Sequence, residues 1–293
     1  MRKNYNIYML KIGKKYLNSS DNDVKNFFYN YNCIFWSLGI GDLLTLDSFI
    51  PDFFYDKIKK IFLFTSINET FRKLIKSNKN YSNAEVIFAD NQYDKGEIYK
   101  IDGYIKSFCL RNKININECF QDDLLIWKTP FIEGIKPKIS SFFTQQLCKI
   151  NYDFLSRDFC VIFPITKNTR DRRFFTPNDW KETIKILKYN KLQGIVIGND
   201  KSDVPKIKNI LDLTGKTTIT EALEITKKAN CYIGIDSFSS TLAMQVFKKE
   251  DIYIKSTEPH LFENIKFFSP FKDETSFISS EIKGINFKFK NLI

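Results

Sequence analysis

The sequence contains a single histidine, His260, among its 293 residues. One imidazole argues against catalytic triads centred on histidine and against metal sites built from histidine clusters. We therefore assign any general-base chemistry to a carboxylate. The six cysteines include no C-x-x-C pair, and several lie in apolar runs such as "FCVIF" and "CYIGI". They are typical of reduced core residues in an intracellular protein, not of a disulfide or zinc framework.

Long apolar runs and basic tails are also missing. No segment approaches the roughly 18 apolar residues that a membrane helix needs, and the start "MRKNYNIYMLKIGKK" has charges throughout and no secretory apolar stretch. We expect a soluble protein of the cytoplasm, either free or on the inner face of the membrane. No run of five or six basic residues marks a tail, so any basic patch must be assembled by folding.

The net charge is nevertheless +11, from 45 Lys and Arg against 34 Asp and Glu. One interpretation is a compositional bias toward lysine without functional meaning. The other is an anionic partner, which could be nucleotide phosphates, a lipid surface or nucleic acid.

The chain is long enough for two domains, and 43% hydrophobic residues suffice for packed cores. Short β-rich runs alternate with helical patterns, which predicts parallel sheets with crossover helices. In the first half we expect strands at 33–38, 61–64, 85–88 and 124–127, and helices at 42–55 and 69–77. A turn-rich basic segment, 127–158, with a further helix at about 140–149, is interpreted as the crossing between domains 1–150 and 151–293.

The pattern restarts after this crossing. Thr176 is the expected N-cap of the next helix, with Pro177 at its first position. Two α/β halves predict a two-lobed molecule whose cleft is the natural ligand site. The expected strands are 159–163, 194–198, 231–235 and 251–255, and the expected helices are 176–188, 204–213, 218–229 and 239–248.

The first motif, "SLGIGDLLTLDSF", follows the strand at 33–38. Gly39 and Gly41 permit a tight turn and close approach of a ligand to the backbone, but no third glycine completes a dinucleotide fingerprint. Asp42 lies at the first turn of the next helix. It is either a catalytic carboxylate at the mouth of the strand or a residue that caps the helix.

The second motif, "PITKNTRDRRFFTPNDW", places four phosphate-binding candidates between a strand and a helix. Arginine forks suit bidentate contacts to phosphate oxygens. The alternative is a solvated basic loop in which one arginine pairs with Asp171. The four candidates are Thr169, Arg170, Arg172 and Arg173.

The third motif, "GIDSFSSTLA", turns from a strand into a helix. The free N–H groups of a helix start suit an anion, and serine hydroxyls add hydrogen bonds. Simple N-capping by serine is the alternative. The junction residues are Asp236, Ser237, Ser239, Ser240 and Thr241.

With these motifs in this order, the chain resembles the heptosyltransferase family of glycosyltransferases (family 9). "GIGDLLTL" is similar to the family's G-x-G-D signature, and "TRDRRFFTPNDW" to its T-R-D-x-K-x-W-P-x-x-x-W loop. "GKTTITEAL", "DSFSSTLAM" and "IKSTEP" match the three later motifs. Together they span about residues 37–270.

The resemblance implies an α/β protein of the GT-B fold, with two Rossmann-like domains facing a cleft. It implies an inverting hexosyl- or heptosyltransferase that needs no metal or other cofactor. Residues 1–150 would bind a glycan or glycolipid acceptor, and residues 151–293 a nucleotide-diphosphate sugar such as ADP-heptose. Asp42 would be the general base. Donor contacts would come from Thr169, Arg170, Arg173, Asp236, Ser237, Ser239, Ser240 and Thr241.

The chain departs from the family at Phe238 and Thr241, where the family has Gly and His, so the sugar and the nucleotide of the donor stay open. Two other functions also remain open. The acceptor could be a nucleic-acid base, for example in viral DNA, which the net charge favours. Alternatively, the chain could be a catalytically inactive binding protein that kept the fold.

Overall fold

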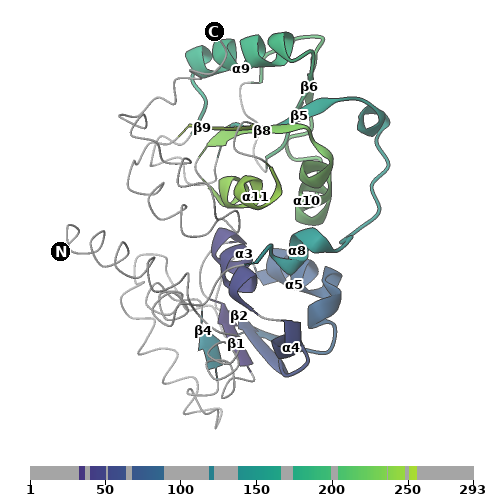
Figure 1. Ribbon diagram of the computed structural model, residues 1–293, viewed down its shortest axis with the longest axis vertical. Coiled ribbons are helices and arrows are strands. Elements are labelled where there is room, and N and C mark those ends of the chain that lie inside the picture. Colours follow the sequence, from purple (N-terminus) through teal and green to yellow (C-terminus); the bar gives the residue numbers. More distant parts are fainter. Residues whose placement is uncertain are drawn as a thin grey trace, which may run out of the picture. The chain divides into compact units, whose positions relative to one another are not determined.

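The protein is represented by a computed structural model, which describes residues 33–36, 40–50, 52–63, 68–88, 119–121, 138–165, 174–198, 204–235, 237–247 and 251–255. The chain divides into two compact units, Met1–Ser141 and Phe142–Ile293. The sequence-based boundary after residue 150 stays a prediction about domains. Each unit contains a parallel sheet with helical connections (Figure 1).

The first unit contains a four-stranded sheet in the order β3-β2-β1-β4, and every pairing in it is parallel. Three of its strands lie within a residue or two of the expected positions. The fourth expected strand, 124–127, lies outside the described residues. The strands are β1 (Cys33–Trp36), β2 (Lys60–Leu63), β3 (Glu85–Phe88) and β4 (Cys119–Gln121).

The expected helix at 42–55 is two helices, α3 (Ile40–Phe49) and α4 (Asp52–Tyr55). The backbone turns tightly at the end of α3, where the Ile50 amide donates to the Asp47 carbonyl (3.1 Å). Pro51 follows, and proline has no amide proton with which to continue a helix. The amphipathic α5 (Asn68–Ser77) lies where expected and buries Phe71, Leu74 and Ile75; the short helix η1 (Lys79–Tyr81) follows it.

The second unit contains a five-stranded, fully parallel sheet in the order β7-β6-β5-β8-β9. The runs "FCVIF" and "CYIGI" are completely buried at its centre, which explains why both are continuously apolar. The strands are β5 (Phe159–Phe163), β6 (Gln193–Val196), β7 (Ile210–Asp212), β8 (Cys231–Ile235) and β9 (Ile252–Lys255).

Three main helices connect these strands: α9 (Pro177–Tyr189), α10 (Ile219–Lys228) and α11 (Phe238–Val246). Thr176 caps α9 with Pro177 at its start, as expected, and Thr218 caps α10. α9 lies on one side of the sheet and α10 and α11 on the other (Figure 1). Ahead of β5, the expected helix at 140–149 is only α8 (Ser141–Thr144), and the short η4 (Asp153–Ser156) follows.

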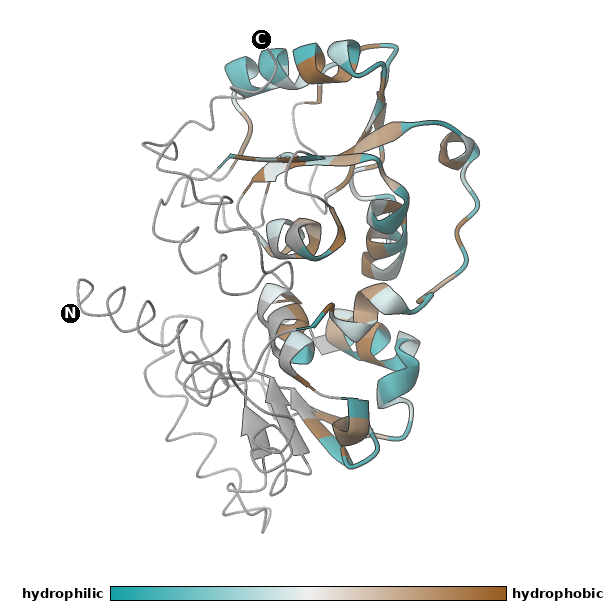
Figure 2. Ribbon diagram, viewed as in Figure 1, coloured by the Kyte–Doolittle hydropathy of each residue, from teal (hydrophilic) through white to brown (hydrophobic). Residues whose placement is uncertain are grey.

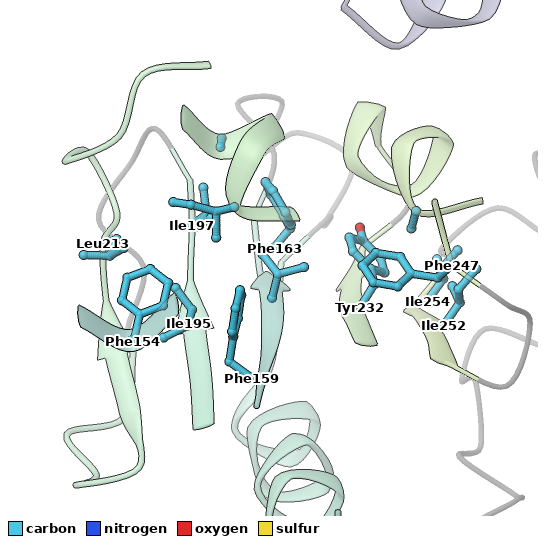
Figure 3. Close-up of a cluster of buried hydrophobic side chains, with 14 residues drawn as sticks. Phe154, Phe159, Phe163, Ile195, Ile197, Leu213, Tyr232, Phe247, Ile252 and Ile254 are labelled. Atoms are coloured by element: carbon cyan, nitrogen blue, oxygen red, sulfur yellow. The ribbon is translucent and has the colours of Figure 1, made fainter. Parts of the chain in front are cut away.

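Side chains that alternate along the strands fill a core on each face of this sheet. Facing α10 and α11 are Val161, Phe163, Ile195 and Tyr232 with the rest of one cluster (Figure 3). Facing α9, a second cluster contains Cys160, Ile162, Trp180 and Leu187 among others. Figure 2 shows hydrophobic colour along the strands and hydrophilic colour over much of α9.

The prediction of a helix at 204–213 is wrong. Residues 204–209 form an irregular turn segment, and Ile210–Asp212 form the edge strand β7, which pairs with β6. Pro205 restricts Val204 to extended conformations, which excludes Val204 from a helix but does not prevent a helix from starting at Pro205. The apolar residues of this segment mimic helical spacing, and pairing with β6 decides the outcome. Periodicity over so short a run cannot separate the two structures.

Candidate functional site

Both sheets have a point where the strand order reverses. In the first unit the chain runs outward from β1 to β2 and β3, and β4 then pairs with the other side of β1. In the second unit the chain runs from β5 to β6 and β7, then returns to β8 beside β5. Ligands of open α/β sheets bind beyond the carboxyl ends of the strands at such points. The three sequence motifs follow β1, β5 and β8, which are strands at these reversals.

The first motif follows β1 and begins α3. Gly39 lies outside the described residues, whereas Gly41 is half-buried in the first turn of α3. Asp42 is the third residue of α3, but its side chain is not among those described. The backbone therefore puts Asp42 near the positive end of the helix, where a carboxylate is stabilised. Its proposed role as a base stays a prediction.

The second motif follows β5. An antiparallel bridge joins Ile165 to Phe174, and the Phe175 amide donates to the Pro164 carbonyl (2.8 Å). The two ends of the segment 166–173 therefore lie together at the carboxyl end of β5. Thr169, Arg170 and Arg173 fall within this segment and lie outside the described residues, as does Arg172.

Lys255 is the last residue of β9. It connects this strand to the start of α9 and to Phe174 at the carboxyl edge of the sheet. Its ammonium donates to Asp179 Oδ2 (2.5 Å) and to the Phe174 carbonyl (3.1 Å), and its backbone is in register with Ile235 at the end of β8. Burial favours the neutral form of the Asp179 carboxyl, but hydrogen bonds from Lys255 and Thr176 outweigh it and lower the pKa of Asp179. The start of α9 is thereby fixed against the carboxyl edge of the sheet.

The third motif joins β8 to α11 through Asp236, which lies outside the described residues. Ser237 is the N-cap of α11: its hydroxyl accepts from the Ser239 amide (3.2 Å), and the Ser240 hydroxyl accepts from the Ser237 amide (3.1 Å). Ser239 and Ser240 are fully buried, while Ser237 is half-buried. Thr241 belongs to α11, but its side chain is not described. The capping interpretation therefore accounts for the hydroxyls of Ser239 and Ser240.

Tyr232 supports this cap from inside the core. Its hydroxyl lies 2.7 Å from Ser239 Oγ, which in turn lies 2.7 Å from Ser237 Oγ. A Cβ at Gly234 would lie 2.2 Å from the Tyr232 hydroxyl, so the tyrosine occupies the space that a larger residue would need. Sequence analysis missed this tyrosine. The signal that could have found it is the alternation in "CYIGI", which puts Tyr232 and Gly234 on one face.

Phe238 stands where the family that the sequence resembles has glycine, and its ring packs edge-on against Phe163 (centroids 6.0 Å apart) at the border of the core cluster. Phe163 also stacks with Tyr232. The bulky side chain at the start of α11 is thus accommodated by the core.

Two buried acids near the crossing segment were also missed by sequence analysis. Asp47 accepts hydrogen bonds from the hydroxyls of Tyr55 (2.9 Å) and Tyr81 and from residues 140 and 141. Burial and the Asp47 charge raise the pKa of both tyrosines, so both phenols remain donors. Because so many donors surround it, we interpret Asp47 as a structural carboxylate. The sequence signal for this role is an acidic residue at a core-facing position of a helix.

Glu224 plays the corresponding part in the second unit. It accepts from the Leu147 amide (2.7 Å) and the Lys227 ammonium (2.7 Å), and Lys227 also donates to the Gln145 carbonyl (2.5 Å). Burial lowers the pKa of Lys227 despite the partner carboxylate. The pair anchors residues 145–147 to α10.

Within the described part of the chain, no group of three His, Cys, Asp or Glu residues could hold a metal ion. The helices described there are not long and apolar enough to cross a membrane.

No protein-family model matches the chain, and no curated protein matches it by sequence. Solved structures do match. E. coli heptosyltransferase WaaC, solved with ADP, has a TM-score of 0.50 at 11% identity, over 77% of this chain and 93% of WaaC. The family 9 glycosyl transferase from Veillonella parvula DSM 2008 has a TM-score of 0.48 at 11% identity, over 82% of this chain and 84% of its own.

The iron-containing dodecameric glycosyltransferase TibC from enterotoxigenic E. coli H10407 matches with a TM-score of 0.45 at 13% identity. The match covers 76% of this chain and 57% of TibC, so this chain spans little more than half the length of that protein. At these identities the likeness concerns the fold. The match to WaaC and the two parallel sheets show the α/β, Rossmann-like architecture of the GT-B heptosyltransferases, which confirms the expected fold class.

Proposed function

We propose that the chain is an inverting, metal-independent glycosyltransferase that moves a sugar from a nucleotide-diphosphate sugar to a hydroxyl group of a glycan or glycolipid. The observation that carries this proposal is the β8–α11 junction. There, a serine-capped helix begins at the carboxyl edge of a parallel sheet, beside the reversal of strand order. The fold shared with WaaC, which was solved with the nucleoside diphosphate ADP, supports the same donor class.

In the proposed reaction, the Asp42 carboxylate accepts the proton of the acceptor hydroxyl. The resulting oxygen attacks the anomeric carbon from the face opposite the diphosphate. The bond between that carbon and the phosphate oxygen breaks, and the nucleoside diphosphate leaves with the bonding electrons. The product is a glycoside of inverted configuration, and no oxidant, reductant or metal ion is consumed.

The start of α11 would stabilise the leaving group. Helix amides and the positive end of the helix dipole favour negative charge, and the leaving diphosphate gains negative charge as the glycosidic bond breaks. Fixed donors at this point therefore stabilise the transition state more than the bound donor. Thr169, Arg170, Arg173 and Asp236 are proposed to complete the donor site with Ser237 and Thr241.

Two of the residues expected to contact the donor are better explained as residues that support the structure of the site. Ser239 and Ser240 are fully buried, and their hydroxyls bond to Tyr232 and Ser237. We propose that they hold Ser237 and the first-turn backbone in position instead of touching the donor. Because the Phe238 ring packs against Phe163 in the core, the change from the family's glycine leaves this role intact.

The test is a turnover assay across nucleotide-diphosphate sugars, ADP-heptose included, with hydrolysis in the absence of acceptor as the first readout. Asp42→Asn is expected to lower kcat by about 10²–10⁴-fold, the usual contribution of a general base, with little effect on donor binding. The matched control is Asp56→Asn, an exposed aspartate after α4, which should retain full turnover.

Proton NMR of the product should show inversion at the anomeric carbon. Unchanged turnover in Asp42→Asn would refute the assigned base. If transferred sugar appears only on DNA, the acceptor is nucleic acid. If no nucleotide sugar raises the melting temperature at millimolar concentration, the chain is an inactive protein of the same fold.

A further inference from the structure

The amino edge of the second unit's sheet carries a cluster of exposed lysines around two exposed apolar side chains. The cluster comes from the end of α9 with the turn after it, and from the turn before β7. We call it the basic corner; its residues are Lys188, Tyr189, Lys191, Lys206, Ile207 and Lys208.

Hydrogen bonds join the two segments of the basic corner. The Asn209 side chain donates to the Leu192 carbonyl (2.6 Å), and the Gly194 amide donates to the Asn209 carbonyl (2.9 Å). Val204 and Ile210 flank the second segment and pack against the core cluster that contains Leu187 and Leu192. The two segments, whose lysines are 15 to 20 positions apart in sequence, are therefore neighbours in the fold.

Among the described residues, none of the four lysines of the basic corner has an ion pair, whereas Lys185, on the same helix as Lys188, pairs with Glu182 (2.8 Å). The helix dipole accounts for a cation in the last turn of α9, which is Lys188. It does not account for the other three lysines, which lie in turns.

The turn after α9 has a lysine at a position where glycine is the most common residue. Lys191 follows the C-cap residue Asn190 and has a positive φ of 55°. Helix ends commonly place glycine at this left-handed position because a Cβ is disfavoured there. A lysine at this strained position adds charge to the basic corner at a cost to the local backbone.

The two apolar members are both exposed to solvent. Tyr189 is 70% exposed and follows Lys188, and Ile207 is 37% exposed and lies between Lys206 and Lys208. Tyrosine is enriched at the boundary between lipid headgroups and acyl chains, where its ring is buried and its hydroxyl stays hydrated. Lysine ammonium groups next to such a ring meet the phosphates of anionic lipids.

We propose that the basic corner docks the protein onto an anionic membrane surface, with Tyr189 and Ile207 entering the headgroup boundary and the four lysines contacting lipid phosphates. An exposed isoleucine favours a lipid surface over nucleic acid, because single-stranded nucleic acid is bound mainly by aromatic stacking and duplexes mainly by charge and hydrogen bonds. Charge and apolar contact together are typical of reversible peripheral binding.

The proposal does not depend on the proposed transferase activity. In a parallel sheet the amino and carboxyl edges are opposite, so the basic corner and the β8–α11 junction lie at opposite edges of the same unit. Membrane docking here would leave the predicted donor site open. A protein that binds membranes but transfers no sugar would contradict only the proposed function.

The experiment is flotation of the full chain with vesicles of phosphatidylcholine alone or with added phosphatidylglycerol, at about 0.15 M salt. Each lysine should contribute about fivefold to partitioning onto anionic vesicles. The variant K188Q/K191Q/K206Q/K208Q should therefore lose binding by about two orders of magnitude or more. The variant Y189S/I207S should bind more weakly and with a steeper salt dependence.

The control is K59Q/K73Q/K76Q/K149Q, which removes the same charge from exposed lysines elsewhere; it should retain most of the binding. All substituted side chains are exposed, and circular dichroism melting verifies folding. Equal loss in both quadruple variants, or no preference of the wild type for phosphatidylglycerol, would overturn the proposal. The proposal would also be overturned if the protein bound duplex DNA through these lysines under conditions in which it does not bind anionic vesicles.

Discussion

Two aspartates lie on α3: Asp42 in its first turn and Asp47 toward its end. Asp47 is fully buried and surrounded by donors from α4, η1 and residues 140 and 141. A buried carboxylate is tolerated only when such donors replace its water. With its oxygens committed, Asp47 is poorly placed to take a proton from a substrate, which leaves Asp42 as the candidate base on this helix.

Asp47→Ala is expected to destabilise the protein strongly, because the hydroxyls of Tyr55, Tyr81 and Ser140 lose their acceptor inside the core. At about 1–3 kcal/mol for each unsatisfied group, the loss should exceed about 3 kcal/mol. Denaturant unfolding measures it, with the exposed Asp56→Ala as the control. A loss below about 1 kcal/mol would mean that the network is not formed in solution.

Gly234→Ala is expected to disturb α11 through Tyr232. The new Cβ would lie 2.2 Å from the tyrosine hydroxyl and 2.5 Å from its ring, so the side chain must move away from Ser239. Overpacking of this kind costs about 1–3 kcal/mol. Gly194→Ala is the control, since its Cβ would meet aliphatic side chains at longer distances: Leu187 at 2.8 Å, Ile162 at 3.0 Å and Ile210 at 3.4 Å. In thermal unfolding, the melting temperature of Gly234→Ala should be lower than that of the control. The reverse order would contradict the proposal that Tyr232 supports the N-cap of α11.

At the scale of elements, the starts of the helices in the second unit are well defined. α9, α10 and α11 each begin with a capping box in which a side-chain oxygen and a backbone amide exchange hydrogen bonds. The cap of α9 has an additional partner, because Asp179 also binds Lys255 from β9. This link fixes the element that follows the arginine-rich segment to the strand next to β8.

The Asp179–Lys255 link predicts a pH dependence. Bonding lowers the pKa of Asp179 in the folded state, so its stabilising contribution is present above the ordinary carboxyl pKa of about 3.9 and is lost as the pH falls through the lowered value. In Lys255→Met the pKa of Asp179 should be higher than in the wild type, because burial raises this pKa and the hydrogen bond from Lys255 no longer counteracts it.

The stability difference between wild type and Lys255→Met should therefore be largest near neutral pH and shrink below about pH 4. Denaturant unfolding at a series of pH values measures it. Lys181→Met, which removes an exposed lysine of the same helix that has no ion pair among the described residues, should show no such trend. A difference independent of pH would show that the ion pair adds no stability.

Sequence patterns predicted some elements well and others poorly, for physical reasons. Strands buried on both faces and helices with local caps, such as α9 with Thr176, are encoded within a few neighbouring residues. The edge strand β7 was mistaken for a helix because its formation depends on pairing with β6, which is not a local property. The contacts of Tyr232 and Asp47 involve residues 7 to 94 positions away, which no short motif records.

For the whole molecule, the order of motifs predicted the GT-B fold, and the strand topology shows why the motifs occur where they do. The three motifs that follow β1, β5 and β8 each lie beside a reversal of strand order in their own sheet. The candidate site could be predicted only as residue types at strand ends. The directions of the Asp42 and Arg173 side chains depend on tertiary contacts and stay predictions.

The central claim is that a nucleoside diphosphate binds where β8 meets α11. It is tested most directly by a crystal structure with the nucleoside diphosphate of the best donor. We expect the terminal phosphate within hydrogen-bond distance of Ser237 and the first-turn amides of α11. A nucleotide bound elsewhere, for example at the amino edge of the sheet, would contradict the claim.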